Sequence, residues 1–127
     1  MIEYYTVFDE FAHNPHPIGV LAYEPSVDKY SMFIDTTLID PRMYPILFGL
    51  NGSNHPTDHT IRNWIESRTT PPDRVGIGDI LKALNLDEYN GWEILKAANG
   101  RNPGYDRWGF VKTDNPNSEF VNKLTWD

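Results

Sequence analysis

The chain has 127 residues, with 18 acidic and 11 basic side chains, a net charge of −7 and no cysteine. At this length we expect one domain, which buries roughly two-thirds of its unfolded surface and needs no metal or disulfide to fold. The acidic balance opposes direct binding of DNA or RNA, which depends on Lys and Arg neutralising phosphates. No apolar run approaches the ~18–20 residues of a membrane span, and the N-terminus lacks a signal-peptide pattern. We therefore expect a soluble, cytoplasmic protein.

The first half of the chain predicts three strands. Residues 4–8, 18–23 and 30–34 are rich in aromatic and β-branched side chains, which favour a pleated, half-buried surface. Proline-containing links at residues 14–17 and 24–26 separate them. Such short links predict an antiparallel meander, in which each strand pairs with the next.

The second half of the chain predicts three helices. Asp58 is expected to cap a first helix that runs to about Arg68, because its carboxylate can accept the free amides of the first turn. A second helix is predicted at residues 79–84, and a third at residues 91–98, capped by Asn90. Each of these segments places apolar side chains at helical spacing on one face, so each should pack through a single stripe.

Gly100 ends the third predicted helix, because it supplies a left-handed helix stop. The tail follows it. Aromatic and polar residues alternate around Trp108 and predict one further strand. The predicted fold class is α+β: a small antiparallel sheet from the N-terminal half, packed with a cluster of about three helices from the C-terminal half. All 127 residues form a single domain, divided into a strand-rich part (1–50), a helix-rich part (57–100) and a C-terminal tail (101–127).

No group of residues predicts catalysis, a metal site or a cofactor. His55 and His59 have the spacing of metal ligands, but Pro56 lies between them and no Glu follows His55 as an HExxH site requires. Residues 76–78 carry two glycines, fewer than a phosphate loop needs, and no serine has a context that supplies a base. We expect a domain that is not an enzyme, has no cofactor and no small-molecule substrate, and acts by binding another protein.

Tryptophan and arginine are frequent in the second half of the chain, and both are enriched at binding hot spots. The tryptophans are Trp64, Trp92, Trp108 and Trp126, and the arginines are Arg62, Arg68, Arg74, Arg101 and Arg107. The positions of Trp64 and Trp92 on apolar helix faces also fit a core role. Arg68 and Arg74 also fit a structural role as partners of nearby carboxylates or helix carbonyls.

The stretch from Trp64 to Arg74, W-I-E-S-R-T-T-P-P-D-R, resembles the W-[LI]-x-x-R-x-x-P-x-x-R segment near the N-terminus of HipA-like serine/threonine kinases. Residues 80–86 are similar to the family's IL-x-x-LGL element, with Asn85 in place of its glycine. Asp106-Arg107-Trp108 resembles the D-x-[YW]-W element, with one aromatic residue lost or shifted.

Further segments extend the resemblance over most of the chain, and it is strongest from about residue 59 to 108. Residues 18–21 and 30–33 resemble the family's opening strands, residues 92–100 resemble a helix that ends in glycine, and residues 119–124 resemble the linker to the kinase core. The phosphate loop and catalytic Asp of that core do not occur in this sequence.

The resemblance implies a free-standing N-terminal subdomain of the HipA-like family. In three-gene relatives such a subdomain, HipS, binds the kinase subunit, HipT, and restrains it. An antitoxin or regulatory subunit of a kinase is therefore expected here, with Trp64 or Trp108 as the aromatic anchor. The residues expected to contact the kinase are Trp64, Arg68, Arg74, Asp106 and Trp108.

Three alternatives remain open at this point. Small, acidic, cysteine-free domains are common among phage-encoded inhibitors of host defence enzymes, such as anti-CRISPR-like proteins. Residues 58–98 also fit a helix-turn-helix in an accessory protein for transcription control, although the acidic charge opposes that reading. An unrecognised enzyme is the third alternative.

Overall fold

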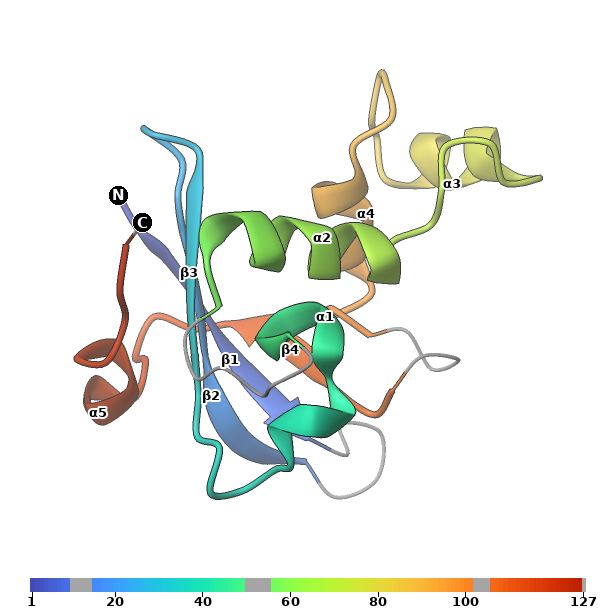
Figure 1. Cartoon of the computed structure of the whole chain (residues 1–127). Helices are drawn as coiled ribbons and strands as arrows, with labels where there is room; N and C mark the ends of the chain where they lie inside the picture. Colours follow the sequence, from blue (N-terminus) through green and yellow to red (C-terminus); the bar gives the residue numbers. More distant parts are fainter. Residues whose placement is uncertain (10–14, 50–55, 102–105, 127) are drawn as a thin grey trace.

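The structure is a computed structural model of the chain, and it describes residues 1–9, 15–49, 56–101 and 106–126. The strands are β1 (Glu3–Asp9), β2 (His16–Glu24), β3 (Lys29–Ile34) and β4 (Gly109–Lys112). They form one antiparallel sheet in the order β3-β2-β1-β4 (Figure 1). The three predicted N-terminal strands and the additional strand in the tail are all present.

The helices are η1 (Pro41–Met43), α1 (Pro45–Phe48), α2 (Asp58–Arg68), α3 (Ile77–Ala83), α4 (Gly91–Ala97) and α5 (Ser118–Val121). In Figure 1, α1, α2 and α4 lie on one side of the sheet, α5 lies on the opposite side, and α3 stands away from the body. The fold is α+β, as predicted. The helix predicted at 79–84 starts two residues earlier, at Ile77, directly after Gly76 in a left-handed conformation.

Strand β2 begins earlier than the proline-rich sequence predicted. His16 pairs with Asp9 and Pro17 pairs with Phe8, after a register shift that follows Val7. Proline is tolerated at the start of a strand and beside a bulge, where its missing N–H costs little. The prediction of a turn was therefore wrong for residues 16 and 17, while Asn14 lies outside the described residues.

The first turn of α2 differs from the prediction by one residue. Thr57 is the N-cap, and its hydroxyl accepts a hydrogen bond from the Thr60 N–H at 3.3 Å. Asp58 is instead the first helical residue, and its carboxylate accepts the Tyr30 N–H at 2.8 Å and pairs with Arg62 at 3.0 Å. Asp58 lies one position too far along the chain to cap α2, so the prediction of this cap was wrong. Its carboxylate instead connects the start of α2 to β3.

The core lies between the sheet and the layer of α1, α2 and α4. The stripe predicted for α2 is buried, and it consists of Ile61, Trp64, Ile65 and Arg68. The largest buried side chains are Trp64 and Trp108.

Both predicted ends of α4 are confirmed. Asn90 caps α4, accepting the Glu93 N–H at 3.2 Å. Gly100 has φ +68°, and a Cβ there would lie 2.2 Å from the Phe110 ring, so only glycine fits this helix stop.

Candidate functional site

Arg68, the last residue of α2, holds together most of the residues that the sequence singled out. Its Nε donates to the Gly100 carbonyl at 3.0 Å, and its Nη2 donates to the Trp108 carbonyl at 2.9 Å. Its Nη1 pairs with the Asp106 carboxylate at 2.6 Å. The guanidinium lies 4.6 Å from the centre of the Trp64 ring. Four of the five predicted site residues therefore meet at one point.

That point lies inside the molecule. The Arg68 side chain is 0% exposed, and Trp64 and Trp108 are each 1% exposed. Neither tryptophan could anchor a partner unless the core opened. In this structure the cluster is a framework that fastens the end of α2 to the end of α4 and to the start of β4. Among the residues that the structure describes, the Trp64 indole N–H has no hydrogen-bond acceptor.

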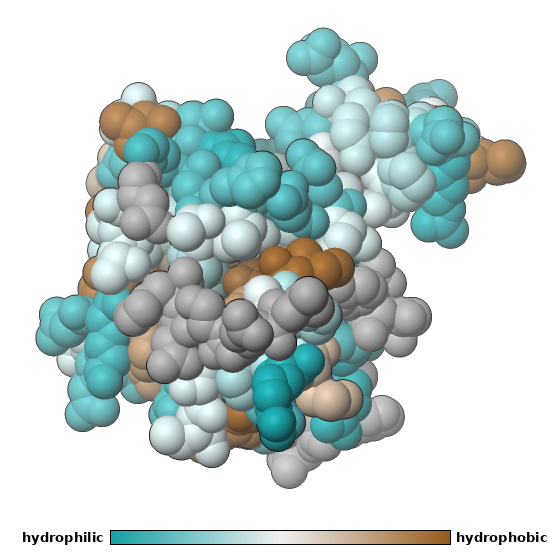
Figure 2. All heavy atoms as spheres, in the orientation of Figure 1, coloured by the Kyte–Doolittle hydropathy of each residue, from teal (hydrophilic) through white to brown (hydrophobic). Residues whose placement is uncertain are grey.

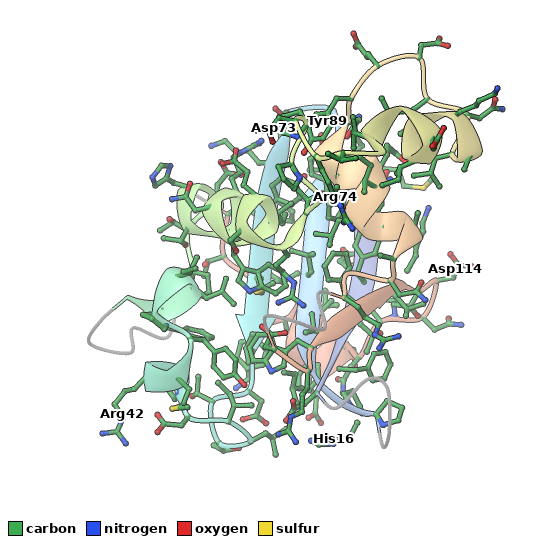
Figure 3. The ribbon with its side chains drawn as sticks, turned by 90° about the vertical axis from the view of Figure 1, so that its right-hand side faces the viewer. His16, Arg42, Asp73, Arg74, Tyr89 and Asp114 are labelled. Atoms are coloured by element: carbon green, nitrogen blue, oxygen red, sulfur yellow. The ribbon has the colours of Figure 1, made fainter. Side chains whose placement is uncertain are left out.

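The fifth predicted residue, Arg74, belongs to a different part of the molecule. It lies in a segment of residues 71–90, here called the arm, which contains α3 and projects from the body (Figure 1). Figure 3 labels Arg74 together with Asp73 and Tyr89, near the root of the arm. Arg74 is exposed, and its backbone N–H donates to the Pro71 carbonyl at 3.3 Å.

The arm exposes apolar surface. Helix α3 contributes no buried residue, and Val75 is 96% exposed. Figure 2 shows a small hydrophobic patch at the outer end of the arm, next to hydrophilic surface. The apolar face of this helix is only half-buried, and it consists of Ile77, Ile80, Leu81 and Leu84.

Hydrogen bonds close the root of the arm. The Tyr89 hydroxyl donates to the Thr70 carbonyl at 2.8 Å, and the Thr69 hydroxyl donates to the Gly91 carbonyl at 2.8 Å. At the far end of α3, Asn85 has φ +62°, a conformation in which asparagine is the commonest substitute for glycine. Asn85 therefore ends α3 in a conformation that glycine commonly supplies.

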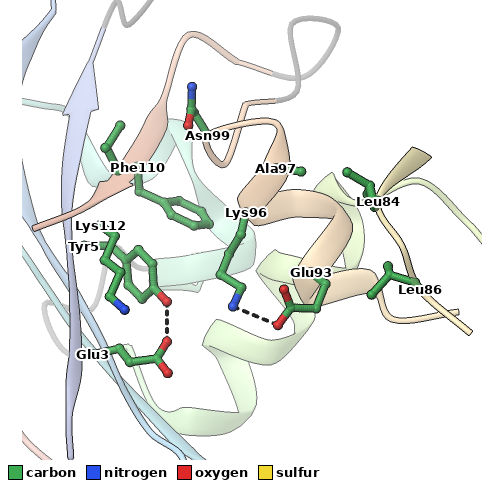
Figure 4. A pocket seen from close by; sticks show the side chains of 11 residues that line it. Glu3, Tyr5, Leu84, Leu86, Glu93, Lys96, Ala97, Asn99, Phe110 and Lys112 are labelled. Carbon is green, nitrogen blue, oxygen red and sulfur yellow. Dashed lines mark hydrogen bonds and ion pairs between the residues drawn. The ribbon is translucent and has the colours of Figure 1, made fainter. Parts of the chain in front are cut away.

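A groove of about 460 Å³ lies between the C-terminal end of α3, helix α4 and the β1–β4 side of the sheet (Figure 4). Its apolar lining comes from the side chains of Tyr5, Leu84, Leu86, Ala97 and Phe110. Its polar lining comes from Glu3, Glu93, Lys96, Asn99 and Lys112. Sequence reasoning missed this groove because its walls come from segments that are distant in the chain and carry no shared motif.

The charged groups of the groove are partly paired with one another. The Lys96 ammonium lies 2.9 Å from the Glu93 carboxylate. The Tyr5 hydroxyl donates to Glu3, and burial, followed by this hydrogen bond, raises the pKa of Tyr5 well above its usual value. The groove thus combines an apolar floor with two acidic and two basic side chains at its margins.

Within the described ranges, no group of three or more His, Asp or Glu residues is placed to hold a metal ion. Across the same residues, no helix is both long and apolar enough to cross a membrane. Comparison with known proteins found no matching family model, no similar curated protein and no similar solved structure.

Proposed function

We propose that this chain is a non-catalytic regulatory subunit of the cytoplasm that binds a HipA-like serine/threonine kinase and restrains it as an antitoxin does. The observation that carries the proposal is the arm, an element that stands away from the body and leaves apolar surface uncovered. The region of strongest resemblance to the family, residues 59–108, includes this arm.

The arm has the composition of a binding element. Val75 is 96% exposed, although a valine gains about 1.5–3 kcal/mol when it is fully buried. Arg74 stands next to it, and Tyr89 lies at the root. Arg and Tyr are enriched at interface hot spots, which cluster near the centre of a contact where water is excluded. The proposed contact therefore moves from the buried tryptophans to Arg74 and its apolar neighbours.

The buried framework around Arg68 holds the base of the arm in place. Arg68 joins the helix that leads into the arm to the strand that borders the groove. A docking surface on a fixed framework loses less conformational entropy when it binds. A subunit of this kind holds its partner in whichever state it binds more tightly, so inhibition requires higher affinity for the inactive kinase.

Co-expression with a HipA-like kinase from the same operon tests the proposal. The expected result is that the two proteins co-purify in a defined ratio and that the chain relieves the growth arrest caused by the kinase. A kinase that neither co-purifies nor loses toxicity would contradict the proposal. Inhibition of a defence enzyme would then become the leading function.

A further inference from the structure

Strand β4 forms one edge of the sheet, because β1 is its neighbour on one side and the strand order ends with it. The register places Val111 opposite Thr6 and Lys112 opposite Tyr5. The Thr113 N–H donates to the Tyr4 carbonyl at 2.9 Å, whereas the Phe110 N–H turns away from β1 and donates to the Asn99 carbonyl at 2.8 Å.

Hydrogen-bonding groups alternate in direction along an antiparallel strand. The backbone N–H and carbonyl groups of Val111 and Thr113 point toward β1. The N–H and carbonyl of Lys112 and the carbonyl of Phe110 therefore point to the open edge. Among the described residues, the outward Lys112 groups have no backbone partner. An extended backbone presents donors and acceptors at a spacing that matches them.

The groove runs beside this edge and supplies contacts for side chains. Figure 4 shows Phe110, Lys112 and Tyr5 on the sheet side of the groove, facing Leu84, Leu86 and Ala97. On the opposite face of β4, the Val111 side chain is exposed. A strand laid along the edge would direct alternate side chains into the groove and toward Val111, because its side chains alternate between the two faces.

We propose that the open edge of β4 binds an extended segment of a partner protein as an added strand, with apolar side chains entering the groove at alternate positions. Pairing of this edge with the same edge of a second copy is disfavoured, because it would bring two Lys112 ammonium groups close together. Naming the partner as a HipA-like kinase depends on the proposed function, whereas the mode of binding does not.

Selection from a displayed library of random short peptides on the full-length chain tests this mode without the kinase. The variant Lys112→Pro removes the outward N–H and leaves the ladder to β1 intact, while Lys112→Ala removes the charge and keeps the N–H. Selected peptides should alternate apolar and polar residues. They should bind Lys112→Pro at least about tenfold more weakly than Lys112→Ala, because the lost hydrogen bond leaves a buried acceptor unpaired.

A second measurement uses the unaltered chain and so does not depend on the folding of Lys112→Pro. Saturation with a selected peptide should slow amide exchange at Lys112 at least about tenfold, since that N–H becomes hydrogen-bonded. Recovery of no peptide, equal binding to both variants, or unchanged exchange at Lys112 would overturn the proposal. Peptides that bind in this way to a chain that ignores the kinase would refute the proposed function alone.

Discussion

Replacing Arg68 with methionine tests whether the buried cluster is the framework described above. Methionine keeps most of the side-chain length but leaves the nearly buried Asp106 carboxylate and the carbonyls of Gly100 and Trp108 without the hydrogen bonds that Arg68 donates. Removing one partner of a buried ion pair costs about 3–5 kcal/mol, so we expect the free energy of unfolding to fall by about 4 kcal/mol. That loss is a large part of the roughly 5–15 kcal/mol that stabilises a typical domain.

Urea denaturation followed by tryptophan fluorescence measures this change. Arg62→Met is the matched control on the same helix, because the Arg62 side chain is 35% exposed and its pairs with Asp58 and Asp28 lie at the surface. We expect this control to cost less than about 1 kcal/mol. If Arg68→Met costs no more than the control, the cluster is not the framework that fastens α2 to β4.

The remaining predictions concern close packing, the arm and buried tyrosine. Gly19→Ala should destabilise the fold by more than about 3 kcal/mol in urea denaturation, because the new Cβ would lie 2.1 Å from the Phe33 carbonyl oxygen; a neutral change would contradict that packing. Gly78→Ala, with nothing within 4 Å, should stabilise α3 by about 1 kcal/mol, seen as slower amide exchange in the arm, and faster exchange would count against an ordered α3. Burial raises the pKa of Tyr5 and Tyr30, so the neutral forms stabilise the fold below the unfolded pKa of about 10, and stability should fall as the pH rises above it. Tyrosinate absorbance should show both residues ionising only on unfolding; full ionisation of all 7 tyrosines in the folded protein would refute this.

The secondary structure could be predicted largely from the sequence because its signals are local. Aromatic and β-branched runs marked β1 to β3, and Asn90 and Gly100 marked the ends of α4. The errors were shifts of one or two residues at the ends of elements: the cap of α2 was predicted at Asp58 instead of Thr57, and β2 begins inside the proline-containing link. The exact end of an element depends on what its last residues contact in space as well as on their own propensity.

The candidate site could not be predicted in the same way. The apolar face of its helix favours a core position for Trp64, but a tryptophan also suits an interface, and only the packing of α2 against the sheet places it inside. Arg68 pairs with Asp106, a residue 38 positions away, across a contact that no local pattern marks. The open edge of β4 follows from the strand order, which the alternation around Trp108 does not specify.

Binding of arm variants to the kinase tests the central claim most directly. Val75→Ser and Arg74→Ala change exposed residues of the arm, while Val27→Ser changes a valine that is 60% exposed in the turn between β2 and β3. All three should leave the free energy of unfolding within about 0.5 kcal/mol of the unaltered chain.

The account predicts that calorimetric titration with a purified HipA-like kinase finds affinity at least about tenfold lower for both arm variants. Arg74→Ala removes a residue of a type enriched at hot spots, and Val75→Ser removes apolar surface that the contact would bury. It predicts unchanged affinity for Val27→Ser. Equal affinity for all three variants, or no binding by the unaltered chain, would contradict the claim that this protein regulates a kinase through its arm.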